Sequence, residues 1–162
     1  MSVPKEVFVF GPPCSGNRLI RRLFRARNVA CSIYHPHLRM HSKPPKLNKR
    51  PGHETYIIRT HRDEGVWYTA WGGNPNVKKP WVLEDFHDLA DIWCRMLGIE
   101  PLHVHYEDVV RAPVKYGRAI CKHTGLAGGK TVQDIWGVKR IYDANKKHLG
   151  GVDHNDPACV DK

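Results

Sequence analysis

Hydrophobic residues recur along the chain in two patterns, short apolar runs and longer amphipathic stretches. Residues 7–10 form an all-apolar run, which is typical of a parallel strand buried on both faces. Residues 17–27 carry their apolar side chains on one stripe, which predicts an amphipathic helix. The same patterns predict further strands over residues 56–59 and 101–106, and further helices over residues 80–97 and 113–124.

These elements alternate between strand and helix, which favours an α/β fold with a central parallel sheet flanked by helices. Residues 31–54 are rich in Pro, His and Lys and are predicted to be loop. The 162 residues suit a single domain with a sizeable core. We expect that domain to cover residues 1–150 and a polar, loosely ordered tail to cover residues 151–162.

Composition bounds the cellular setting and the partners. No apolar stretch reaches the length of a membrane span and the first residues lack a signal-peptide pattern, so we expect a cytoplasmic protein. The 5 cysteines show no CxxC pair, which is typical of free thiols in a reducing compartment. The net charge of +10 predicts anionic partners, with a merely basic surface as the alternative. Nucleic acid is disfavoured among them, because the basic residues look dispersed and no nucleic-acid-binding motif appears.

The stretch GPPCSGNRLI, residues 11–20, joins the first strand to the first helix. Such a turn directs several backbone N–H groups at one spot, where the helix dipole adds positive charge, so it predicts an anion site. A Walker A loop has Lys and Ser/Thr after its second glycine, but Asn17 and Arg18 follow Gly16 here. A Mg²⁺-dependent nucleoside triphosphatase is therefore disfavoured. The alternative is a tight strand-to-helix turn without a ligand.

Four segments together resemble the sulfotransferases that use 3′-phosphoadenosine 5′-phosphosulfate (PAPS). GPPCSGNRLI is similar to the 5′-phosphosulfate loop of that family, and YIIRTHRDEGVWYTAW, residues 56–71, to its 3′-phosphate segment. HVHYEDVVRAPVKYGRAICKHTGL, residues 103–126, is similar to a strand-to-helix element, and RMHSKPP, residues 39–45, to the stretch with the catalytic histidine. The resemblance implies a three-layer P-loop-like fold, with residues 1–150 as one sulfotransferase-like domain.

The resemblance also implies an activity, the metal-independent transfer of a sulfuryl group from PAPS to an acceptor hydroxyl or amine. The product nucleotide is 3′-phosphoadenosine 5′-phosphate (PAP). Arg59 would bind the 3′-phosphate, because a guanidinium fork matches phosphate oxygens. Arg18 would add a cation at the reacting end, and Trp67 and Trp71 are candidate adenine-stacking rings. The 5′ end of the nucleotide would lie on the loop residues Pro13, Cys14, Ser15, Gly16, Asn17, Arg18 and Leu19.

The resemblance selects His41 as the general base, since histidine titrates near neutrality. Four other histidines compete for this role: His35, His37, His53 and His61. A zinc site is a further alternative, although the spacing of the histidines in residues 35–53 matches no standard ligand pattern. Glu107 and Asp108 are predicted to begin a helix and not to act in catalysis.

Several positions depart from the family pattern. Cys14 stands where the family has Lys or Arg, His61 replaces a proline, and Trp67 falls where a serine is expected. Many family members are also longer, so the acceptor site is predicted to be open or completed by a second subunit. The acceptor, a small molecule or a glycan, is not identified by the sequence. The alternatives to the enzyme are a nucleotide-binding protein without catalysis, a small P-loop kinase and a basic nucleic-acid-binding protein.

Overall fold

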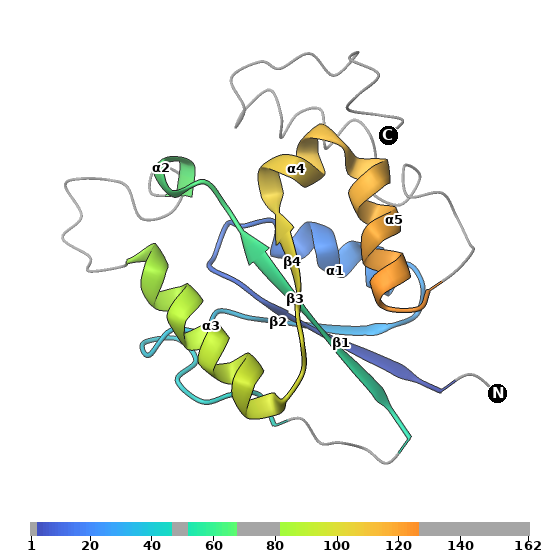
Figure 1. Cartoon of the computed structure of the whole chain (residues 1–162), viewed down its shortest axis with the longest axis horizontal. Coiled ribbons are helices and arrows are strands. Elements are labelled where there is room, and N and C mark those ends of the chain that lie inside the picture. Colours follow the sequence, from blue (N-terminus) through green and yellow to red (C-terminus); the bar gives the residue numbers. More distant parts are fainter. Residues whose placement is uncertain (1–2, 47–51, 68–81, 127–162) are drawn as a thin grey trace.

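The computed structural model describes residues 3–46, 52–67 and 82–126, which contain four strands and five helices (Figure 1). The strands are β1 (Lys5–Phe10), β2 (Ala30–Tyr34), β3 (Glu54–His61) and β4 (Leu102–His105). The helices are α1 (Asn17–Arg25), α2 (Glu64–Trp67), α3 (Leu83–Leu97), α4 (Tyr106–Arg111) and α5 (Pro113–His123). The predicted α/β class is confirmed.

The four strands form one parallel sheet in the order β2-β1-β3-β4. The chain therefore leaves β1 toward one edge to form β2 and then returns to the other side of β1 to form β3. In open parallel sheets, ligands bind outside the carboxyl ends of the strands at the point where the strand order reverses. That point lies here between the ends of β1 and β3.

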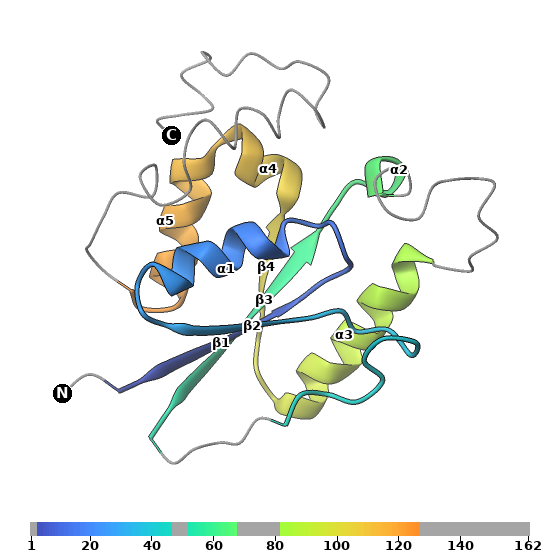
Figure 2. The same cartoon turned by 180° about the vertical axis from the view of Figure 1, so that it is seen from behind.

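Helices cover both faces of the sheet, which makes three layers. Figures 1 and 2 show α1, α4 and α5 on one face and α3 on the other. Alternate residues of β1 serve the two layers, with Val7 and Val9 in the core beneath α1 and α5, and Phe8 and Phe10 in the core beneath α3. Double-sided burial of this kind explains why the strand reads as an unbroken apolar run.

Three predicted strands and three predicted helices are present, with shifted ends. The prediction of loop for residues 31–54 is wrong at its start and end, because β2 occupies Ala30–Tyr34 and β3 already begins at Glu54. The β2 segment is only partly buried, and its pairing with β1 fixes it as a strand although its own residues give a weak signal. The short helix α2 was not predicted, and α4 was indicated only by the acidic pair Glu107 and Asp108 at its start.

Some predictions fall outside the described residues, among them the first two positions of the predicted helix at 80–97, the tail at 151–162 and Cys159. The other cysteines are free thiols, with Cys14 exposed and Cys31, Cys94 and Cys121 buried. Within the described ranges, no helix is both long enough and apolar enough to cross a membrane.

Candidate functional site

The loop between β1 and α1 is held tightly against two neighbouring elements. A side chain at Gly11 would place its Cβ 1.7 Å from Thr60 Oγ1, at the end of β3. At Gly16, where φ is +84°, a Cβ would lie 2.5 Å from Tyr106 Cδ2, at the start of α4. Cys14 also has a positive φ of 58°. The loop thus follows a path that only these glycines permit, between β3 and α4.

Ser15 and Asn17, two of the predicted ligand residues, have side chains that brace the loop from inside. Ser15 Oγ donates to the Pro12 carbonyl at 2.6 Å and lies 2.8 Å from Thr60 Oγ1. Asn17 Nδ2 donates to the same carbonyl at 2.9 Å, and Thr60 Oγ1 donates to Asn17 Oδ1. The two residues are only 1% and 5% exposed. Their side chains therefore shape the loop, and its backbone is left to face a ligand.

Several backbone N–H groups of the loop have no hydrogen-bond acceptor among the described residues. Leu19 and Ile20 donate their N–H groups to the Gly16 carbonyl, at 3.0 and 3.2 Å. For the N–H groups of residues 14–18, in contrast, no acceptor is found within the described part of the chain. Successive free N–H groups at the start of a helix form an anion-binding concavity. This arrangement has the geometry expected of an anion site, and anion binding at this turn stays a prediction.

Arg62 brings a buried guanidinium to the same loop. Its Nη1 donates to the Cys14 carbonyl, and its guanidinium carbon lies 4.6 Å from the centre of the Tyr106 ring. The side chain is 3% exposed, and Glu107 Oε1 is 4.0 Å from Nε. Nε and Nη2 have no hydrogen-bond acceptor among the described residues. Arg62 was not among the predicted ligands, although it lies within residues 56–71, the stretch that resembles the 3′-phosphate segment of the family.

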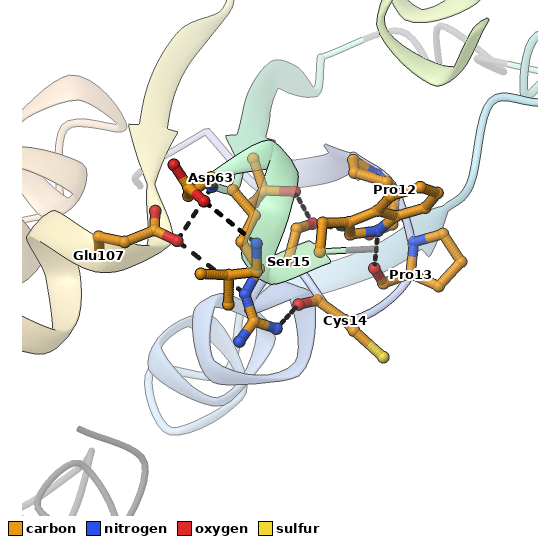
Figure 3. A network of polar contacts seen from close by, with 10 residues as sticks. Pro12, Pro13, Cys14, Ser15, Asp63 and Glu107 are labelled. Atoms are coloured by element: carbon orange, nitrogen blue, oxygen red, sulfur yellow. Dashed lines mark hydrogen bonds and ion pairs between the residues drawn. The ribbon is translucent and has the colours of Figure 1, made fainter. Parts of the chain in front are cut away.

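Glu107 orients the segment that carries Arg62. Its Oε1 accepts a hydrogen bond of 3.0 Å from the Asp63 N–H, and Figure 3 shows Glu107 and Asp63 beside the loop residues Cys14 and Ser15. Asp63 in turn accepts a hydrogen bond of 3.1 Å from the Val66 N–H, at the first turn of α2. Glu107 thus lies at the start of α4, as predicted, and also links the end of β3 to that helix.

Trp67 supports the loop from behind. Its Nε1 donates to the Pro13 carbonyl at 2.8 Å, and its fully buried ring packs against Phe86 at 5.7 Å between ring centroids. The structure therefore places Trp67 next to the loop but within the core, with no exposed ring face. Trp71, the other candidate for stacking on adenine, lies outside the described residues.

Arg59 lies on the opposite side of the sheet from the loop. It is 1% exposed and forms an ion pair with Asp91 of α3. Its Nη2 donates to His87 Nδ1 at 3.0 Å. The structure does not bring Arg59 together with the loop residues, and its assignment to the 3′-phosphate stays a prediction.

His35 is the histidine that the structure holds against the loop. Its Nδ1 lies 2.9 Å from the Gly11 carbonyl, which can only accept, so Nδ1 carries the proton and Nε2 keeps its lone pair. Burial lowers the pKa of His35, and the charges of His41 and Arg18 act in the same direction, against that hydrogen bond. His41 is exposed and rests edge-on against Tyr34, with 5.6 Å between the ring centroids. His35 follows β2 directly, so reading β2 as loop hid its place at the edge of the sheet.

Four other histidines gather around Arg59: His61, His87, His103 and His105. His61 Nε2 lies 2.8 Å from His103 Nδ1, and the His61 ring stacks on that of His87 at 4.6 Å. Burial lowers the pKa of His61 to about 3 and that of His87 to about 4, with neighbouring positive charges contributing. Among the described residues, no three His, Cys, Asp or Glu side chains are arranged to hold a metal ion.

Comparison with known proteins adds no family assignment, since no family model matches the chain and no curated protein matches its sequence. The resemblance to PAPS-dependent sulfotransferases therefore stays a prediction from the motifs, and the geometry of the loop is the structural basis for a proposed function.

Proposed function

We propose that the protein binds a phosphorylated nucleotide of the PAPS and PAP type on the loop and transfers a sulfuryl group from PAPS to an acceptor. The observation that carries the proposal is the run of backbone N–H groups at residues 14–18 without an acceptor in the described chain, at the carboxyl end of a central strand. Backbone donors at a helix start bind sulfate and phosphate groups alike. The choice of PAPS over other nucleotides comes from the motif resemblance.

The residues present fit the 5′-phosphosulfate end of such a nucleotide. Arg62, beside Cys14, has two donor atoms, Nε and Nη2, without an acceptor among the described residues, and the exposed Arg18 lies in the first turn of α1. Buried donors that lack a partner favour an anionic ligand, because leaving them unsatisfied costs about 1–3 kcal/mol. We therefore assign Arg62 to the anion site together with Arg18. At Arg59, where the resemblance places the 3′-phosphate, only Nε lacks an acceptor among the described residues, and Asp91 balances the charge.

We assign the general base to His35, which replaces His41 as the leading candidate. In this role, His35 Nε2 takes the proton of the acceptor hydroxyl while the acceptor oxygen forms its bond to sulfur. The bond between sulfur and the 5′-phosphate oxygen breaks in the same step, and PAP leaves with the electron pair. The loop N–H groups and Arg62 stabilise the charge that develops on the departing oxygens.

A nucleotide-binding protein without turnover is the second candidate. It is favoured by Cys14, which offers no cation at the position where the related loop has Lys or Arg. The two candidates share the anion site and differ only in activity toward an acceptor.

Calorimetric titration with PAP, with ATP–Mg²⁺ alongside, tests the proposal. We expect selective binding of PAP, and loss of that binding in Gly16→Ala, because the added Cβ meets Tyr106. Gly98→Ala is the matched control: Gly98 also has a positive φ, of +66°, but no atom lies within 4 Å of its Cβ position. Both variants pay the left-handed backbone cost of about 1–2 kcal/mol.

Binding of ATP–Mg²⁺ in place of PAP would overturn the proposal and favour a small P-loop kinase. Binding of neither nucleotide would leave the loop as a structural turn. Equal loss of PAP affinity in both glycine variants would mean that global stability, and not the loop, controls binding.

A further inference from the structure

The exposed surface of two helices carries rows of basic side chains. On α1, the exposed residues Arg18, Arg22 and Arg25 follow one another at spacings of four and three residues. On α5, the exposed residues Lys115, Arg118 and Lys122 follow at spacings of three and four. Side chains at these spacings lie on one face of a helix. We call these six residues the basic face.

The two helices belong to the same layer of the molecule. Ile20, Leu23 and Phe24 of α1 share one core with Ile120 and Cys121 of α5. Figures 1 and 2 both show α1 and α5 on the side of the sheet away from α3. The outer surfaces of both helices therefore face away from the sheet on the same side.

Nothing in the described chain neutralises the basic face. Neither α1 nor α5 contains an acidic residue, and none of the six cations forms an ion pair with another described residue. Like charges four residues apart on a helix destabilise it by about 0.2–0.5 kcal/mol per pair. An external polyanion would offset this repulsion.

The opposite layer has the opposite sign. Helix α3 exposes four acidic residues, Glu84, Asp85, Asp88 and Asp91, against the single cation Arg95. The charges of the described surface are therefore not spread evenly. The dispersed distribution inferred from the sequence is thus wrong for these helices, because residues far apart along the chain meet on one layer.

We propose that the basic face binds the phosphodiester backbone of nucleic acid. Arginine, which supplies four of the six cations, presents a planar fork that matches phosphate oxygens. The exposed large hydrophobic side chains in the described ranges all lie outside α1 and α5: Val3, Leu38, Met40, Val82, Ile92 and Met96. Insertion into a membrane and a protein interface with an apolar core both require such side chains, so this face favours a purely electrostatic partner.

Arg18 belongs both to this face and to the proposed anion site, whereas the other five cations of the face belong to the face alone, so the experiment uses variants of those five to separate the two interactions. Fluorescence anisotropy with a fluorescein-labelled 20-base-pair DNA duplex is measured between 50 and 200 mM salt. With six phosphate contacts, affinity falls about 10³-fold over this range. Arg22→Glu and Arg118→Glu, on different helices, each weaken binding about tenfold at 100 mM salt and make the salt slope shallower by about one.

Arg95→Glu on α3 is the matched control, because it changes the net charge by the same amount on the opposite layer. We expect it to alter duplex affinity less than about twofold, as it removes no phosphate contact. PAP titration of Arg22→Glu should match that of the unmodified protein, and circular dichroism checks that each variant is folded. Equal losses in Arg22→Glu and Arg95→Glu would overturn the proposal. Tighter binding to a sulfated glycan or to anionic lipid vesicles than to the duplex would also overturn it.

Discussion

Two arginines stand three residues apart at the carboxyl end of β3, both buried, and their surroundings differ in kind. Arg59 faces α3, where it pairs with Asp91 and donates to His87. Arg62 faces the loop, where it donates to the Cys14 carbonyl and keeps Nε and Nη2 without a hydrogen-bond acceptor among the described residues. Both arginines have an acidic neighbour, which for Arg62 is Glu107 at 4.0 Å, so the contrast lies in their donors. Within the described residues, Arg62 keeps two nitrogens without an acceptor beside free backbone N–H groups, which suits an external anion, whereas Arg59 keeps only Nε and is held by Asp91 and His87.

The largest effect is expected from Asp91→Asn, which removes the counter-charge of Arg59. The guanidinium is 1% exposed, so the variant leaves a buried cation without its acidic partner. Such changes cost about 3–5 kcal/mol, and we expect about 3 kcal/mol because Asp91 itself is half exposed to water. Urea denaturation measures the loss of unfolding free energy. PAP affinity, titrated in the same variant, should be unchanged.

Asp88→Asn, on the same helix, is the control for this variant, since Asp88 is exposed and forms no ion pair with another described residue. Its stability should stay within about 0.5 kcal/mol of that of the unmodified protein. If Asp91→Asn unfolds no more easily than Asp88→Asn, the pair with Arg59 does not stabilise the fold.

Arg62→Gln is the corresponding experiment on the loop side, and its main effect is expected on PAP affinity and not on the free energy of unfolding. Hydrogen bonds to charged groups contribute about 1.5–3 kcal/mol, so PAP affinity should fall about thirtyfold. Unfolding free energy should fall by about 1–2 kcal/mol, less than in Asp91→Asn, because the hydrogen bond to the Cys14 carbonyl, the ion pair with Glu107 and the contact with the Tyr106 ring are lost. Arg111→Gln, at the exposed end of α4, is the control. A larger loss of PAP affinity in Arg59→Gln than in Arg62→Gln would restore Arg59 as the phosphate ligand.

The contrast between these arginines also marks how far the sequence alone could lead. The apolar run at residues 7–10 and the turn after it were sufficient to predict the central strand and the turn that joins it to α1. The predicted end of the next strand at Arg59 was two residues short, since β3 continues to His61. Side chains alternate along a strand, so Thr60 faces the loop while Arg59 and His61 face α3. Only the register of the sheet reveals which basic residue reaches the loop.

Two other features depend on tertiary contacts that no local pattern encodes. Ser15 was predicted to donate to a ligand, but it bonds Pro12 and Thr60, and the latter lies 45 residues away in the chain. The sequence did not distinguish His35 from the other histidines. Its place beside Gly11 follows from the pairing of β2 with β1, because His35 comes directly after β2. In both cases the residue type was informative, while its role depended on which distant segment lay next to it.

The acid response of the α3 side provides the smallest expected effect. His87 Nδ1 accepts from Arg59, and His61 shares one hydrogen bond with His103, so further protonation breaks these contacts. The pKa of His61 is lowered to about 3 and that of His87 to about 4, below the ordinary value of 6.5. The unfolded chain therefore binds more protons below pH 6.5, and stability falls as the pH drops from there toward the folded pKa values.

Between pH 7 and pH 5, we expect the titration of these two histidines to lower the free energy of unfolding by about 1.5 kcal/mol. This is less than half of what the same pKa shifts would contribute for fully buried rings, because water reaches both rings. Urea denaturation at the two pH values measures it, and His61→Asn should reduce the loss because one of the two groups no longer titrates. His41→Asn replaces an exposed histidine that packs against Tyr34, away from the cluster, and should leave this loss of unfolding free energy unchanged. Stability that is flat from pH 7 to pH 5 would show that the cluster around Arg59 takes up protons without breaking its contacts. In that case the α3 side of β3 would tolerate added positive charge, and the distinction between its two arginines would rest on the donors that Arg62 keeps without an acceptor among the described residues.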